Sequence, residues 1–175
     1  MAKLINLATT LLSTFSMDLK KTLHTFSYFQ YPFLAASLYF LVEPLIMGYF
    51  SDPENILINL FASYGNALFF LGIGISFTTL ADTTKTHNNF SKKIWQNPKK
   101  GKFFIKLVIG EIIFFFLFGL IVYFVGDSDE FKNFGLGSIV LGVGLIGMLK
   151  TGMEYFENHR LDKIENKQKE AVKPL

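Results

Sequence analysis

The sequence predicts an all-α integral membrane protein built around a four-transmembrane-helix bundle. Four long apolar stretches, and the charged loops that separate them, support this prediction. An α-helix rises about 1.5 Å per residue, so roughly 20 apolar residues can cross a hydrocarbon core of about 30 Å. The stretches that meet this requirement in the 175-residue chain are 32–50, 56–80, 103–125 and 134–156.

The composition limits the class of protein further. Half of the residues are hydrophobic, including 21 Phe, and they fall in four long runs where a soluble domain would show shorter amphipathic segments. The spans and their connections, residues 28–156, use most of the chain, so we expect one membrane domain and no sizeable soluble domain. The chain has no Cys, which excludes disulfides, thiol catalysis and thiolate metal sites.

The charged residues predict how the chain is threaded. The middle loop, 81–102, contains six Lys, and the N-terminal segment and the C-terminal tail are also basic. The short loops 51–55 and 126–133 carry mainly acidic side chains. Because basic loops stay on the cytoplasmic side, we predict that both termini and the middle loop are cytoplasmic. The content of Lys, Asn, Ile and Phe favours a bacterial source, and hence the inner membrane.

The two ends of the chain are predicted to be cytoplasmic helical segments. In residues 1–27 apolar side chains recur at spacings of three and four, which indicates an amphipathic interfacial helix. Asp18, Lys20 and Lys21 interrupt the apolar run of this segment, so we do not interpret the segment as a cleaved signal peptide. It could lie on the inner leaflet or pack against the bundle. The tail, 157–175, is highly charged and is predicted to extend the fourth span.

Trp95, Lys92 and Lys93 in the middle loop form a pattern that is typical of a membrane interface. Trp residues are enriched at the headgroup level, and Lys residues are attracted to anionic lipid. We therefore expect a short surface helix here, with these three residues as anchors to an anionic inner leaflet. Binding of a partner protein is the alternative interpretation. The excess of Lys over Arg gives no support to a nucleic-acid partner.

Two acidic residues, Glu43 and Glu111, fall within the apolar spans. From the helix rise, Glu43 lies about 16 Å and Glu111 about 12 Å from the inner boundary, and Asn66 falls about 15 Å from it. We therefore expect these three side chains to share a layer near the membrane midplane. Further polar residues follow at helical spacing on the same spans, namely Asn59 and Ser63 before Asn66, and Tyr39 one turn before Glu43.

The predicted polar layer has two interpretations. Ionisable residues in a span usually face protein or water, so Glu43 beside Pro44, which leaves a backbone carbonyl without its helical donor, could form a cation or proton pathway. Alternatively, these groups hold helices together, with Lys106 and Lys150 as possible ion-pair partners of the acids.

The fourth span is rich in small residues, which allow helix backbones to approach closely in lipid. We expect one small-residue face to pack within the subunit and another to contact a neighbouring subunit, giving a homo-oligomer or a larger complex. The residues assigned to this helix-packing or oligomer face are Gly137, Ser138, Gly142, Gly144, Gly147 and Thr151.

No sequence motif supports an enzyme, a metal site or a cofactor. Residues 142–147 match the glycine pattern of dinucleotide-binding proteins, but that pattern requires a strand before it and a helix N-terminus after the turn. His24, His87 and His159 have no metal-ligand spacing. The first hypothesis is therefore a non-enzymatic multi-pass membrane protein that self-associates or serves as the membrane subunit of a larger complex. The alternative is a small oligomeric channel for protons or cations that uses the midplane acids.

Overall fold

The described part of the chain is almost entirely helical. The computed structural model describes residues 22–47, 56–80 and 89–163. Four of its helices are long and apolar enough to cross a membrane, which agrees with the number of spans expected from the sequence. The elements in order are η1 (Ser27–Phe29), α2 (Gln30–Met47), α3 (Ile56–Phe77), η3 (Thr78–Leu80), α4 (Asn89–Trp95), α5 (Pro98–Val125) and α6 (Asp129–His159).

Several sequence predictions fall outside these residues. Most of the expected amphipathic helix, 1–21, lies outside the described part of the chain. The same holds for residues 164–175 of the expected tail, for the connection 48–55 and for residues 81–88 of the basic loop.

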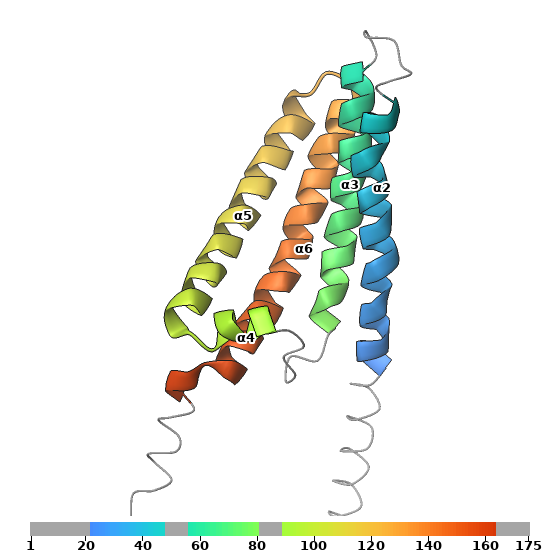
Figure 1. The fold of residues 1–175 in the computed structure, drawn as a ribbon. Coiled ribbons are helices and arrows are strands. Elements are labelled where there is room, and N and C mark those ends of the chain that lie inside the picture. The colour runs from blue at the N-terminus through green and yellow to red at the C-terminus, as the bar shows by residue number, and fades with distance from the viewer. Residues whose placement is uncertain (1–21, 48–55, 81–88, 164–175) are drawn as a thin grey trace, which may run out of the picture.

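The long helices lie side by side in the order α2, α3, α6, α5 (Figure 1). Extensive contacts join α2 to α3, α3 to α6, and α6 to α5. The two edge helices, α2 and α5, have at most slight contact with each other. The described residues therefore form an open row of helices. A closed four-helix bundle would also require extensive contact between α2 and α5, which these residues do not show.

Helix α6 lies inside the row because glycines on two of its faces admit the neighbouring backbones. A methyl group on Gly72 of α3 would lie 2.6 Å from the carbonyl oxygen of Val140, and one on Gly144 would overlap the Gly72 carbonyl oxygen. On the other face, a methyl group on Gly135 would lie 2.8 Å from the carbonyl oxygen of Gly119 in α5. Such close backbone approach replaces the hydrophobic driving force that lipid does not supply.

Local signals fix the start of α5 and of α6. The side chain of Asn97 accepts hydrogen bonds from the backbone N–H groups of Lys99 and Lys100, at 3.0 and 3.2 Å, and Pro98 occupies the first turn of α5. Ser128 accepts from the N–H of Phe131 at 3.4 Å and caps α6. Both helices begin five residues before the predicted spans. The prediction located spans by their apolar residues, and the first turns of these two helices contain polar and charged residues.

Candidate functional site

Glu43 makes a hydrogen bond between the first two spans. The hydroxyl of Ser63 on α3 donates to Oε2 of Glu43 on α2 at 3.0 Å, and both residues are half-buried. Pro44 follows Glu43, and α2 continues past it to Met47. The sequence singles out both residues without pairing them, and in the structure their hydrogen bond joins the edge helix α2 to α3.

Asn66 makes its contact with a residue that the sequence analysis did not single out. The side-chain amide of Asn133 donates to Oδ1 of Asn66 at 3.2 Å, which joins α3 to α6. Asn133 lies one residue before the predicted fourth span, so a search confined to the apolar stretches passes over it. It lies in the second turn of α6, so this bond lies toward the end of the row where α5 connects to α6.

Glu111 lies apart from Glu43 and Asn66 in the row of helices. It lies on α5, at the opposite edge of the row from α2, and it is exposed. The described residues give its carboxyl group no hydrogen bond and no ion pair, either with Lys106 or with Lys150, which are both exposed. Similar calculated depths in the membrane do not place Glu43 beside Glu111, because two helices separate α2 from α5.

The remaining members of the predicted polar set face outward. Tyr39 on α2 is 60% exposed, and its ring contacts only the edge of the Phe40 ring among the aromatic pairs described. Asn59, in the first turn of α3, is also exposed. Neither residue extends the contact between Glu43 and Ser63 into a longer chain of polar groups.

The small residues of α6 pack within one copy of the chain. Gly137 and Gly144 lie against Gly65 and Gly72 of α3. Ser138 is fully buried and donates to the carbonyl of Phe134 at 3.0 Å, and Thr151 donates to the carbonyl of Gly147 at 3.2 Å. Gly142 lies against the Phe116 ring of α5. Gly147 lies against Thr79, so the packing that these residues show is within one copy of the chain.

Trp95, which the sequence assigns to the membrane interface, packs inside the protein. Its side chain is only 7% exposed and contacts the rings of Phe104 and Tyr155, with centroid separations of 5.3 and 6.1 Å. Gly152 of α6 leaves the space for it. Lys92 and Lys93 are exposed, as an interfacial role requires, but the indole of Trp95 joins α4 to α5 and α6 and does not face lipid.

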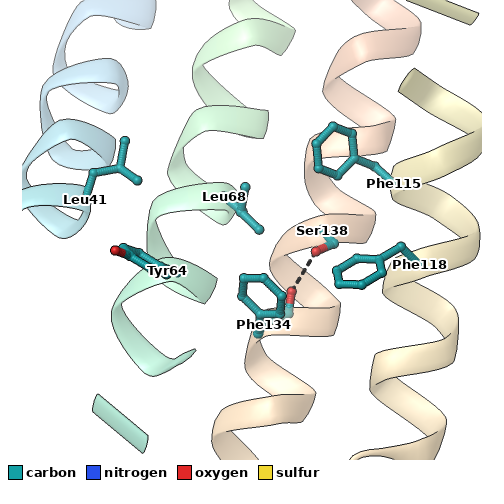
Figure 2. A pocket seen from close by; sticks show the side chains of 7 residues that line it. All are labelled: Leu41, Tyr64, Leu68, Phe115, Phe118, Phe134 and Ser138. Atoms are coloured by element: carbon teal, nitrogen blue, oxygen red, sulfur yellow. Dashed lines mark hydrogen bonds between the residues drawn. The ribbon is translucent and has the colours of Figure 1, made fainter. Parts of the chain in front are cut away.

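An open pocket of about 260 Å³ lies on one face of the row and is lined by all four long helices (Figure 2). Its wall is aliphatic and aromatic, and the one hydroxyl on α6 is bonded to its own helix. The side-chain hydroxyls among the lining residues belong to Tyr64 and Ser138, and the other side chains are apolar. The lining residues are Leu41, Tyr64, Leu68, Phe115, Phe118, Phe134 and Ser138.

Comparison with known protein families, curated proteins and solved structures found no match.

Proposed function

We propose that this chain is a non-enzymatic, multi-pass membrane protein that is completed by a second copy or by another membrane subunit. The observation that supports this proposal is the position of Glu111. The side chain lies on the outer side of a 28-residue apolar helix, and its own copy offers it no partner among the described residues. An assembly in which another protein covers this edge of the row would provide one.

The energy of an exposed acid in lipid argues for such a cover. Glu111 lies about 12 Å along the helix from Phe103, where the apolar stretch begins. A charged side chain near the bilayer centre costs about 2.5–3.5 kcal/mol on insertion scales, and ionisable residues in spans usually face protein or water. The open row leaves α5 free to receive a neighbouring helix.

The proposed orientation follows from the basic residues. With both termini and α4 in the cytoplasm of a bacterial cell, Lys92 and Lys93 would lie at the anionic inner leaflet. Lys99 and Lys100, at the start of α5, flank an apolar pocket lined by Ile94, Phe103 and Phe104. This side of the protein would contact anionic headgroups, and it is also the docking side for a cytoplasmic partner.

A proton or cation channel is the second candidate, and the contact between Glu43 and Ser63 is the observation that favours it. A half-buried carboxyl group with a hydroxyl partner is a chemically suitable proton site. The positions of Asn66 and Glu111 argue against a pathway through one copy, because no hydrogen bond among the described residues joins either of them to Glu43. A channel would therefore require several copies around a shared axis.

The test of the first proposal is the mass of the protein particle extracted from membranes with its surrounding lipid. We expect a mass that contains two or more chains of 19.9 kDa, or one chain with a partner. Glu111→Gln should weaken that association by about 3- to 30-fold, because interhelical polar contacts in membranes are worth about 0.6–2 kcal/mol. Asp127→Asn, which changes an exposed acid in the α5–α6 connection, is the matched control. A single chain at every lipid-to-protein ratio would refute the proposal.

The test of the second candidate is proton and cation flux into liposomes that contain the purified protein. Flux that Glu43→Gln abolishes, with particle mass unchanged, would support a channel. Absence of flux in the parent protein across a range of voltages and pH gradients would argue against it.

A further inference from the structure

The outer face of α5 carries an unbroken apolar stripe with the heptad spacing of a helix pair. Six large apolar residues and Gly110, at alternating separations of four and three, lie opposite the buried Val108 and Gly119. With heptad positions a and d assigned to the stripe, the a positions are Leu107, Phe114 and Ile121. The d positions are Phe103, Gly110, Leu117 and Phe124. All are exposed, and a methyl group on Gly110 would meet nothing within 4 Å.

The two ionisable side chains that flank this stripe determine what would cover it. A face turned to lipid would show the same apolar spacing, so the stripe alone does not identify an occupant. Lys106 falls at position g and Glu111 at position e of the following heptad. Both are exposed, and α5 carries no acid within one turn of Lys106 and no base within one turn of Glu111.

In a parallel pair of helices, position g of one heptad faces position e of the next heptad on the other helix, and charges at these positions set partner and orientation. A second copy of α5 would therefore bring its Glu111 to Lys106 and its Lys106 to Glu111. An antiparallel pair would oppose Lys to Lys and Glu to Glu. Copies inserted with the same topology are parallel, so the membrane permits the arrangement that the charges favour.

We propose that two copies of this chain associate through α5 as a parallel, left-handed helix pair, in which Lys106 of each copy pairs with Glu111 of the other. The inference depends on the proposed function, because it names a second copy as the cover for this edge of the row. Left-handed packing of this type is common among transmembrane helices. Two rows of helices then join edge to edge, and each Glu111 gains a cationic partner within the apolar zone.

The natural absence of Cys makes disulfide cross-linking a direct test. In a parallel pair, a residue at position a or d faces its own equivalent, and a disulfide requires Cα atoms closer than about 7 Å. Phe114→Cys and Leu117→Cys should therefore cross-link in lipid membranes at least about tenfold faster than Ile109→Cys. Ile109 is the matched control because it is exposed on the same helix but lies away from the stripe.

Charge reversal tests the reciprocal ion pairs in the Leu117→Cys background. Lys106→Glu and Glu111→Lys should each slow cross-linking about tenfold, because each brings like charges together, and the double reversal should restore the rate to within about twofold. Recovery in the double variant cannot come from a merely structural role of either residue. If the single variants fail to insert, the periodic pattern of cross-linking and the double variant decide the question.

The outcomes separate this inference from the proposed function. Particles that contain several chains or a partner, with no difference between the stripe and Ile109, would overturn the α5 pair and leave the assembly proposal standing. Particles with a single chain and no cross-linking would overturn both. Fast cross-linking at the stripe without rescue by the double reversal would overturn the ion-pair arrangement.

Discussion

Helices α5 and α6 are neighbours in the sequence, yet the less hydrophobic of the two occupies the interior. The most apolar window of α5 has a mean hydropathy of 2.6 and is 11% buried, whereas that of α6 has a mean hydropathy of 1.7 and is 44% buried. In a water-soluble protein the more apolar helix would be expected inside. In lipid, hydrocarbon solvates Phe and Leu as well as protein does, so residue size and polar contacts decide which helix is enclosed.

The largest expected effect concerns Trp95, through which α4 packs against α5 and α6. Trp95→Ala removes the ring contacts with Phe104 and Tyr155, and truncation of a buried Trp costs about 3–5 kcal/mol. We expect a matching fall in the free energy of unfolding in detergent, together with faster proteolysis near α4. Phe103→Ala is the control, because Phe103 is 68% exposed. Equal losses in the two variants would show that Trp95 does not anchor α4.

The second prediction contrasts one glycine of α6 with one of α5. Gly144→Ala places a methyl group against the Gly72 carbonyl, so we expect a loss of about 1–3 kcal/mol from overpacking. Within a single copy, Gly110→Ala meets no neighbouring atom, so in detergent that holds the protein as single chains it should be neutral or stabilising by up to about 1 kcal/mol, since Ala favours the helix. Thermal unfolding monitored by circular dichroism measures both. Indistinguishable melting temperatures would contradict the enclosed position of α6.

The smallest expected effect concerns the polar bond between α3 and α6. A double-mutant cycle with Asn66→Ala and Asn133→Ala should give a coupling free energy of about 0.6–2 kcal/mol, which is the range for interhelical hydrogen bonds in membranes. The matched cycle of Asn59→Ala with Asn133→Ala should give none, because Asn59 is exposed. Unfolding equilibria in mixed micelles provide the measurement, and equal coupling in the two cycles would contradict the assignment.

The candidate site was predictable only in part. Glu43 and Ser63 were both singled out from the sequence, and they meet because α2 and α3 are adjacent in the row. Glu111 was expected in the same layer, but equal depth says nothing about which helices are neighbours. The partner of Asn66 was missed because Asn133 precedes the apolar stretch, although α6 already begins at Asp129.

The sequence by itself determined the number of the spans and their order along the chain, because membrane crossing depends on length and apolar content. The starts of α5 and α6 depend on local sequence, because Asn97 and Ser128 cap their own helices, which begin five residues before the apolar stretches. Only the tertiary structure decided the order of the row, the enclosure of Trp95 and the isolation of Glu111. These features depend on which helices pack together at their glycines. That packing depends on the shapes of two helix surfaces at once, so the sequence of one helix does not determine it.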